Sequence, residues 1–440
     1  MKNKLLLLLL IPAISFSQKK WSLKECVDRA LEKNISVQQN QLNVNLAKKD
    51  VAIAKGNFLP NLTASTGGNL NFGTGFDPVS QDRVNTSLFG GGIRANSAIT
   101  VFNGYRNTYI YKQAQLGIKS SLLDLKKIKN DISLFIVNGY LNILFAKENL
   151  NIANVQYKIS SNQIKVTERR FESGIIPKGD LLNAQSTAAA DLQRVVAQEN
   201  ALNLALLNLA QALQIPANDF DILSVNVDNQ LTNLLYKNSS VIYNKSLERL
   251  PEIERAKLSL ENAKLATQIS KSSFLPTITA SASLSSNYRY NLNLPEGFSN
   301  TNLYEQLNDN FGYGAGFSIN IPIFNRFQTK NNVAKSLINQ ELSKTRLENE
   351  KLQLKQTIEQ AFLDAKAALK NYEASKISLS AQKEAFKNAQ ERYNNGVITL
   401  FDLDLVRIRF VNAESSLIRS KYDYVFKTKV LQFYSGELTF

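Results

Sequence analysis

Residues 170–181 read RFESGIIPKGDL, and residues 392–403 read RYNNGVITLFDL. Both stretches run from a basic and an aromatic residue to glycine and then, after five intervening residues, to aspartate and leucine. Such a glycine can adopt the left-handed conformation that ends a helix, and the aspartate can cap or charge-stabilise the start of the next helix. A single copy would fit an ordinary helical hairpin turn as well as it would fit a functional role. Two copies half a chain apart predict a two-fold internal repeat with a shared role.

The composition argues against most classes of enzyme. The 440-residue chain has no histidine and one cysteine, which removes the usual zinc ligands and the Ser-His and Cys-His pairs of nucleophilic catalysis. It has no glycine-rich phosphate loop. We therefore expect no catalytic residue, metal site or cofactor, although carboxylate-only catalysis stays open. The net charge of +15 is spread along helical stretches, which favours solvated helix faces over nucleic-acid binding.

The first residues have the pattern of a secretory signal. Two lysines precede an apolar run at residues 5–11, and residues 15–17 offer a cleavage site. The apolar run is too short to span a bilayer. We expect residues 1–17 to be a signal peptide. Cys26 lies well past this site, so we expect neither a lipid-anchored start nor an internal disulfide.

The first predicted repeat spans residues 18–217. Apolar residues at helical spacing predict a helix from Trp21 to about Asn57, with Ser22 and Glu25 as a capping box. The pattern then changes to a period of two, which is typical of strands. The further elements expected are strands at 58–74 and 88–102 with a loop at 73–87, a helix at 104–172, the turn, and a helix at 180–213.

The second predicted repeat spans residues 246–440, after a connector at 218–245. Phe274-Leu275-Pro276 repeats Phe58-Leu59-Pro60 where the strands start. The elements expected are a helix to about residue 272, strands at 274–291 and 311–323 with a polar loop between them, a helix at 325–394, the turn, and a helix at 402–433.

The predicted strands alternate between apolar and small polar residues. Even positions are mostly apolar from Leu62 to Phe72 and from Ile278 to Tyr290, and odd positions there are mostly Asn, Thr, Ser or Gly. A soluble sandwich would also alternate, but these strands are long enough to cross a bilayer at a tilt, and aromatic residues gather toward their ends. We therefore expect a membrane barrel with even positions toward lipid and odd positions toward the lumen.

Four strands are too few to close a barrel. The smallest membrane barrels have about eight strands, and an open edge in lipid leaves backbone groups unpaired. Several copies must therefore combine: three would give twelve strands, and two would give eight strands with a lumen filled by side chains. The longest helices, of about 100 Å, are too long and too polar to be membrane spans, so we expect them to project into the periplasm.

On the repeat, the two Phe-Leu-Pro segments and the two Gly-x5-Asp turns, the chain resembles the outer-membrane efflux proteins, the TolC-like channels. The resemblance covers essentially all of the mature chain. It implies a mainly α homotrimer with a transmembrane β part: a twelve-stranded outer-membrane β-barrel, four strands per chain, continued by a long periplasmic α-helical barrel.

The resemblance also implies a function and partners. The trimer would be the exit duct of a tripartite efflux or type I secretion system in the Gram-negative outer membrane. Small molecules or polypeptides would pass through it passively, driven by an inner-membrane pump of the RND, ABC or MFS type. A periplasmic membrane-fusion adaptor would join the pump to the duct. The alternative from a different class is a barrel-anchored structural stalk or adhesin.

The resemblance finally implies roles for the turn residues. Hairpin tips of the family contact the adaptor, and the corresponding positions are Gly174, Ile175, Ile176, Asp180, Gly396, Val397, Ile398 and Asp402. Inward-facing tip aspartates of the family form a constriction. Asp402 matches the first of them, Leu405 stands in the place of the second, and Asp404 is its neighbour. The expectation is an acidic ring of Asp402 and Asp404, and the alternative is that Asp402 only supports the start of its helix.

Overall fold

The structure, a computed structural model, describes residues 20–76, 81–218, 220–224, 236–294 and 297–437. The predicted signal peptide lies outside these residues. The chain forms two compact units, each built from segments that are distant in sequence. The helical unit comprises residues 1–42, 123–254 and 349–440, and the sheet unit comprises 43–122 and 255–348. Both units draw on both predicted repeats, so the units do not coincide with the repeats.

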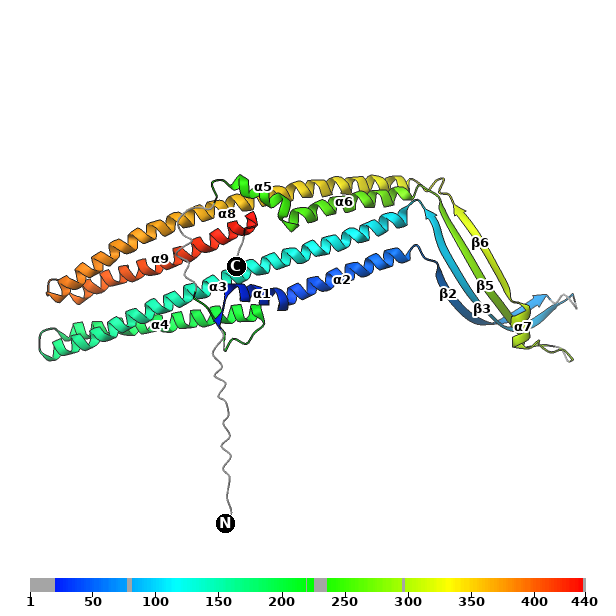
Figure 1. The fold of residues 1–440 in the computed structure, drawn as a ribbon. Coiled ribbons are helices and arrows are strands. Elements are labelled where there is room, and N and C mark those ends of the chain that lie inside the picture. Colours follow the sequence, from blue (N-terminus) through cyan, green and yellow to red (C-terminus); the bar gives the residue numbers. More distant parts are fainter. Residues whose placement is uncertain (1–19, 77–80, 219, 225–235, 295–296, 438–440) are drawn as a thin grey trace, which may run out of the picture. The chain divides into compact units, whose positions relative to one another are not determined.

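Two sets of four helices have the same lengths in the same order, and Figure 1 labels them along the chain. Helices α1 (Leu23–Lys33), α2 (Ile35–Gly56), α3 (Arg106–Glu172) and α4 (Lys178–Leu213) have 11, 22, 67 and 36 residues. Helices α5 (Ser239–Arg249), α6 (Pro251–Ser272), α8 (Gln328–Asn394) and α9 (Leu400–Ser435) have the same 11, 22, 67 and 36 residues. In the described part of the chain, none of the helices is both long enough and apolar enough to cross a membrane.

The continuous helix predicted for residues 21–57 is wrong in one respect, because it is broken at Asn34. The backbone of Asn34 leaves the helical region, and its side-chain oxygen accepts a hydrogen bond from the Ser36 N–H at 2.9 Å. A short polar side chain of this kind competes with the helix for backbone groups. The predicted capping box is confirmed, since Glu25 N–H donates to Ser22 Oγ and Ser22 N–H donates to the Glu25 carboxylate.

The corresponding break in the second half lies at Leu250, whose backbone is extended. Pro251 follows as the first residue of α6, a position where its missing N–H costs nothing. Helix α5 begins at Ser239, inside the predicted connector at 218–245. The connector also holds β4 (Asp221–Ile222), which pairs in parallel with β1 (Lys20–Trp21). Each of these strands has only two residues, too few to show an alternation of apolar and polar residues. The sequence therefore did not predict them.

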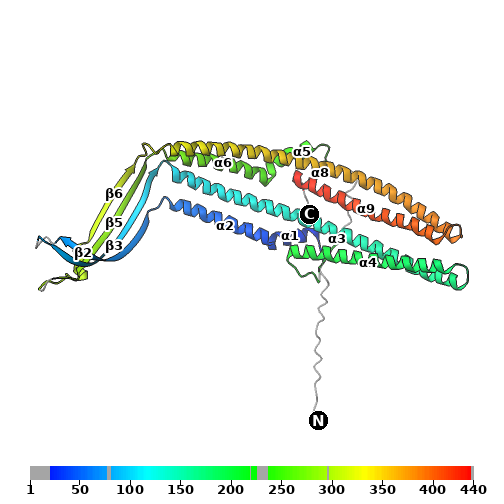
Figure 2. The same cartoon turned by 180° about the vertical axis from the view of Figure 1, so that it is seen from behind.

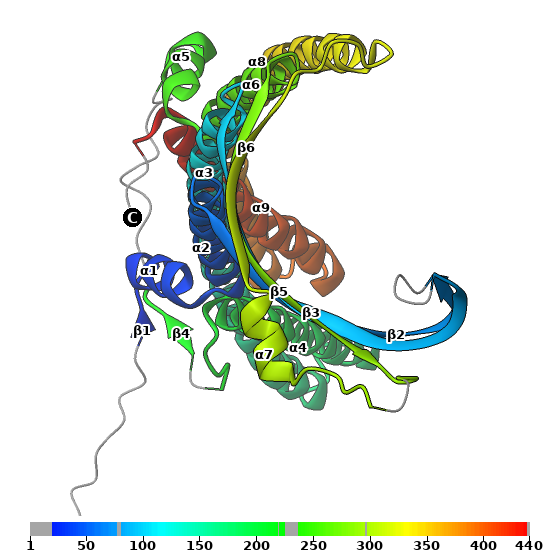
Figure 3. The same cartoon turned by 90° about the vertical axis from the view of Figure 1, so that its right-hand side faces the viewer.

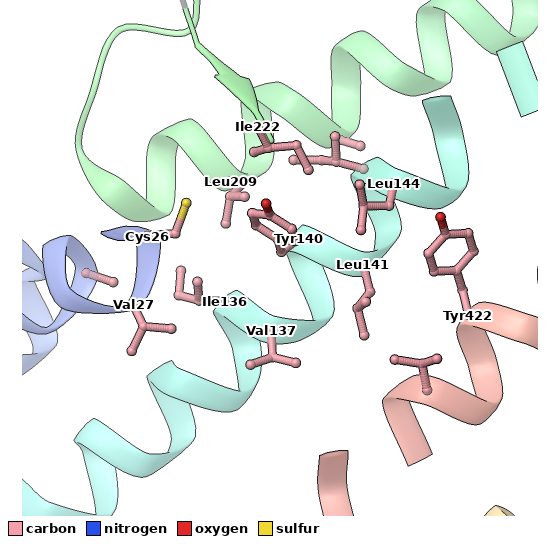
Figure 4. Close-up of a cluster of buried hydrophobic side chains, with 14 of the residues drawn as sticks. Cys26, Val27, Ile136, Val137, Tyr140, Leu141, Leu144, Leu209, Ile222 and Tyr422 are labelled. Atoms are coloured by element: carbon pink, nitrogen blue, oxygen red, sulfur yellow. The ribbon is translucent and has the colours of Figure 1, made fainter. Parts of the chain in front are cut away.

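The core of the helical unit surrounds the middle of α3 (Figure 4). Ile136 and Tyr140 of α3 are fully buried against Cys26 of α1, Leu209 of α4 and Ile222 of β4. The Tyr140 hydroxyl donates a hydrogen bond to the Leu223 carbonyl at 2.7 Å, which satisfies the polar end of this buried side chain. Each of these contacts joins segments far apart in sequence, so this cluster fixes how the helices of the unit pack.

The sheet unit contains one antiparallel sheet of four strands, in the order β2-β3-β5-β6. Its strands are β2 (Asn61–Phe76), β3 (Arg83–Asn103), β5 (Thr277–Asn291) and β6 (Gly312–Asn320). They lie side by side and curve strongly (Figure 3). The view from behind shows the same neighbours (Figure 2). Strands β2 and β6 form the two edges of the sheet.

The register puts the predicted apolar positions of β2 and β5 on one face, together with the apolar residues of β3 and β6 that pair with them. Directly paired residues of antiparallel strands share a face, and Leu70 pairs with Phe89, which in turn pairs with Tyr290. Farther along the sheet, Leu284 pairs with Tyr313. The opposite face carries the small polar residues in matching rows, for example Thr63 with Asn96 and Asn96 with Ser283.

The loop predicted for residues 73–87 is wrong at both ends. Residues 73–76 of β2 pair with residues 83–86 of β3. Gly, Thr and Asn suggested a loop there, but the partner strand supplies the hydrogen bonds that local propensity does not predict. Near the other end of β3 the register shifts between Thr100 and Phe102. Val101 is therefore the extra residue of a bulge. As a result, Phe102 and not Val101 pairs with Ile278.

The region between β5 and β6 also differs from prediction. Helix α7 (Leu303–Asp309) lies in the predicted polar loop, and Asn302 caps it by accepting from Glu305 N–H. Strand β6 ends at Asn320, shorter than the predicted range 311–323. Pro322 follows closely and has no N–H to donate to a ladder.

Candidate functional site at the two helical turns

The two turns have the same backbone geometry. Gly174 and Gly396 adopt φ of 73° and 72°, the left-handed region. Each glycine N–H donates to the carbonyl three residues back, Phe171 or Tyr393, at 2.8 and 3.0 Å. The next residue donates to the carbonyl five residues back, at 2.9 Å in both turns. This pair of bonds is the Schellman motif that closes a helix, so each predicted glycine ends its helix as expected.

The start of the outgoing helix differs between the two turns. Thr399 is the N-cap of α9: its hydroxyl accepts from Asp402 N–H at 3.2 Å and donates to the Asp402 carboxylate at 2.7 Å. The cap is therefore Thr399, and Asp402 is its partner in a capping box. In the other turn Pro177 precedes α4 without a side-chain cap. Asp180 lies in the first turn of α4, where its charge suits the helix dipole.

The capping box changes the acidity of Asp402. The Thr399 hydroxyl, together with the Thr399 N–H at 3.1 Å, holds the pKa of the Asp402 carboxyl below its ordinary value, and the charge of Arg392 acts in the same direction. The carboxyl is fully exposed. Within one chain, Asp402 is therefore a solvent-facing anion at neutral pH.

The other predicted tip residues divide into exposed and half-buried positions. Ile175 and Val397 follow the two glycines, and their exposed fractions are 71% and 63%. Ile176 and Ile398 are half-buried, and Ile398 packs against a small core of Ala184, Ala389, Leu400 and Leu403. Each turn therefore presents one bare apolar side chain to solvent and turns the next one inward.

The basic and aromatic residues of the repeat motif connect the two turns. The Arg170 guanidinium of the first turn lies over the Tyr393 ring of the second, 5.6 Å from its centroid. The Tyr393 hydroxyl accepts from Gln163 Nε2 at 3.3 Å. The basic and aromatic residues that mark the repeat in the sequence thus make a cation–π contact across the two hairpins.

Asp404 points into the helical unit and pairs with a buried arginine. Arg407 Nε donates to Asp404 Oδ1 at 3.2 Å, and Arg407 Nη1 donates to Asp191 Oδ2 at 2.7 Å. The side chains of Arg407 and Asp191 are 7% and 3% exposed. The Thr187 hydroxyl donates to the second Asp404 oxygen at 3.1 Å. The negative charge of Asp404 is therefore compensated inside the protein, whereas that of Asp402 faces solvent.

Sequence reasoning missed Arg407, Asp191 and Thr187. Asp191 and Arg407 are 216 residues apart and belong to different helices, so no local spacing connects them. Thr399 could have been recognised, because Thr399 and Asp402 have the spacing of a capping box. Among the residues that the structure describes, no cluster of three or more acidic or cysteine side chains could hold a metal ion.

The sequence is similar to known outer membrane proteins. The sequence model of the family described as outer membrane efflux protein matches residues 26–213 and again residues 242–437. The pyoverdine export outer membrane protein OpmQ of Pseudomonas aeruginosa is 23% identical over 398 residues, covering 86% of this chain and 77% of OpmQ. Outer membrane protein TolC of Escherichia coli is 23% identical over 297 residues, covering 65% of this chain and 57% of TolC.

Solved structures share the fold at low sequence identity. The crystal structure of the outer membrane protein VceC from Vibrio cholerae has a TM-score of 0.75 at 14% identity, covering 94% of this chain and 96% of VceC. This likeness concerns the fold, and the family model accounts for most of the sequence. The protein therefore belongs to the outer membrane efflux protein family.

Proposed function

We propose that three copies of this chain form a twelve-stranded outer-membrane β-barrel, continued by a periplasmic α-helical barrel. The trimer acts as the exit duct of a tripartite efflux or type I secretion system. Small molecules or polypeptides pass through it without any energy input from the duct itself. An inner-membrane pump of the RND, ABC or MFS type drives transport, and a periplasmic membrane-fusion adaptor connects pump and duct.

The observation that carries this proposal is the sheet. One face is apolar and bare to solvent: Leu62 and Phe317 are 79% and 77% exposed. A soluble sheet buries such a face, whereas a membrane barrel turns it toward lipid. The edges of the sheet are β2 and β6, and unpaired edges in lipid are too costly to persist. Pairing β2 of one copy with β6 of the next removes every edge when the ring closes.

The helices support assembly for a related reason. Helix α2 exposes Leu46 and Ile53, and α8 exposes Ile338 and Leu342, in each case at spacings that put the pair on one helix face. Bare apolar stripes of this kind indicate contact with another molecule. In the proposed trimer they are covered by helices of the neighbouring copies. The two matches of the family model and the matched helix lengths support the two-fold repeat.

We assign adaptor docking to the tips. Ile175 and Val397 give each tip an exposed apolar side chain, and Gly174 and Gly396 keep the backbone beside them accessible. Asp180, Asp402 and the half-buried Ile176 and Ile398 complete the predicted docking positions. The name of OpmQ concerns pyoverdine export, which supports an export role for this chain as well.

We also propose that Asp402 supplies the charge of an acidic ring where three tips approach the axis. Asp404 contributes less, because Arg407 compensates its charge. Three like charges near a narrow axis attract cations and resist anions. Asp402→Asn is the test in bilayer recordings, since the amide keeps most of the capping ability and removes the charge. Unchanged cation selectivity and divalent-cation block in that variant would leave only the capping role.

Conductance of the purified protein in planar lipid bilayers tests the proposed duct. We expect discrete channel openings that persist under an applied voltage and that require the intact assembly. A folded assembly that inserts into bilayers but never conducts would exclude the duct and favour the alternative function, a barrel-anchored stalk or adhesin.

A further inference from the structure

The polar face of the sheet is hollowed beside helix α7. A cavity of about 800 Å³ lies there, lined by residues of β2, β3, β5 and α7. Its charged lining residues, within the described part of the chain, are Arg94 and Arg289. The rest of the lining is dominated by amides, hydroxyls and glycines. The cavity is therefore polar and cationic.

The register puts both arginines on the predicted lumen face. Arg94 pairs with Ser65 on one side and with Ser285 on the other, and Arg289 pairs with Gly90. The two side chains are on neighbouring strands, two rows apart, which corresponds to about 14 Å along the strands. Both are exposed, so their charges reach the water in the cavity.

Glycine keeps the space between the arginines open. The row that separates them consists of Gly67, Gly92 and Asn287. A Cβ added to Gly92 would lie 2.8 Å from the Ser286 carbonyl oxygen, so the backbone leaves no room for a side chain there. Larger residues in this row would fill the cavity or distort the sheet.

Helix α7 fixes the wall of the cavity beside β5. The Arg289 N–H donates to Gln306 Oε1 at 2.7 Å, and Asn310 Nδ2 donates to the Asn287 carbonyl at 2.8 Å. These bonds satisfy backbone groups of β5 beyond Ser285, where β5 no longer pairs with β6. The acidic residues of α7, Glu305 and Asp309, are not among the lining residues, whereas Gln306 of α7 is.

We propose that this cavity is an anion-attracting vestibule, and that Arg94 and Arg289 make the barrel favour cargo bearing carboxylate, phosphate or sulfonate groups. The inference rests on the proposed duct, since the polar face is the lumen only if copies close into a barrel. Two arginines from each copy would then surround one passage. Like-signed charges in a confined lumen raise the local concentration of counter-ions. The vestibule would act in series with the acidic ring at the tips and with the opposite preference.

The first test measures local charge preference without any need for conduction. Ser65→Cys puts a thiol directly beside Arg94, and the native Cys26 is buried and does not compete. The probes are two methanethiosulfonates, one carrying a sulfonate and one a quaternary ammonium. We expect the sulfonate-to-ammonium ratio of modification rates to fall by about threefold or more when Arg94→Gln and Arg289→Gln are added.

Two control variants make the result specific. Arg94→Lys with Arg289→Lys keeps the charge and should retain the ratio. Arg83→Gln removes a charge from the opposite face, where Arg83 pairs with Phe76, and should leave the ratio unchanged. The inference would be overturned if the ratio of modification rates stayed the same in the Arg94→Gln/Arg289→Gln variant, or if it fell equally with Arg83→Gln.

The second test separates this inference from the proposed function. The reversal potential in a KCl gradient should move toward cation selectivity in the Arg94→Gln/Arg289→Gln variant. Conductance with an unmoved reversal potential would overturn the vestibule and leave the duct intact. A changed modification ratio in a protein that does not conduct would instead refute the duct while the anion-attracting cavity stands.

Discussion

At the scale of single residues, Arg407 forms ion pairs with the buried Asp191 and with the partly exposed Asp404. Arg407 is almost completely removed from water and donates to carboxylates on α4 and on its own helix α9. Burying a guanidinium costs several kcal/mol, and well-placed carboxylates offset that cost. The group therefore holds α4 and α9 together only while every member is present.

Removing one member of this group should be far more damaging than replacing the pair. We expect Asp191→Asn to cost about 3–5 kcal/mol, because Arg407 keeps a buried charge with one carboxylate less. The apolar double variant Asp191→Leu/Arg407→Met should recover most of that loss. Hydrogen exchange of α4 and α9 amides, followed by mass spectrometry, measures the effect. Equal protection in the wild type and in Asp191→Asn would contradict this role of the pair.

Asp402 gives the tips a pH dependence of known sign. Its pKa is lowered in the folded protein by the bonds from Thr399. A carboxyl of this kind adds stability above its unfolded pKa and loses it as pH falls through the lower folded pKa. We expect amide protection in the first turn of α9 to hold at neutral pH and to decline below pH of about 4. Asp402→Asn should abolish that acid dependence, and an unchanged acid profile in the variant would show that another group is responsible.

At the scale of elements, local signals predicted the turns and the strand faces. Gly174 and Gly396 end their helices because a left-handed residue is needed there, which is a local requirement visible in the sequence. The alternation of β2 and β5 likewise reflects the pleat of a single strand. The breaks at Asn34 and Leu250 have local causes, the Asn34 side chain and Pro251, which the period of the apolar residues does not report. The pairing of residues 73–76 and the bulge at Val101 depend instead on partners distant in sequence. Periodicity within one segment does not reveal those partners.

The turn glycines offer a matched pair of substitutions. A Cβ at Gly396 would meet no atom within 4 Å, but φ is 72°. Gly396→Ala should therefore cost about 1–2 kcal/mol through backbone strain alone. Gly179 lies inside α4, also in open space and without a positive φ, so Gly179→Ala should stabilise by up to about 1 kcal/mol. Thermal unfolding in detergent measures both, and shifts of the same sign would contradict the assigned turn geometry.

The two faces of β2 should respond differently to an introduced charge. Ala64→Arg places a charge on the apolar face and should cost about 2–4 kcal/mol of folding free energy near the bilayer midplane. Thr63→Arg places it on the polar face, where water can solvate it, and should be tolerated while altering conductance. Reversible folding into lipid vesicles gives both free energies. Similar losses for the two variants would mean that the faces or the register are assigned wrongly.

At the scale of the whole molecule, the family recognised from the repeat and the turns is confirmed by the family model, which matches most of the chain. The protein is located in the outer membrane of Gram-negative bacteria, with its helical part in the periplasm, as predicted. The roles of the tip residues stay predictions. A motif locates the turn residues, but the proposed ring and docking surface involve more than one chain. Asp404 illustrates how a partner within the chain can change the role that its position in the motif implies.

The central claim is that three chains close one barrel, because one chain supplies four strands and two open edges. Native mass spectrometry of the purified protein, released from detergent micelles, tests it most directly. The account predicts a mass of three mature chains and no stable folded monomer. A folded monomer or dimer as the principal species would contradict it.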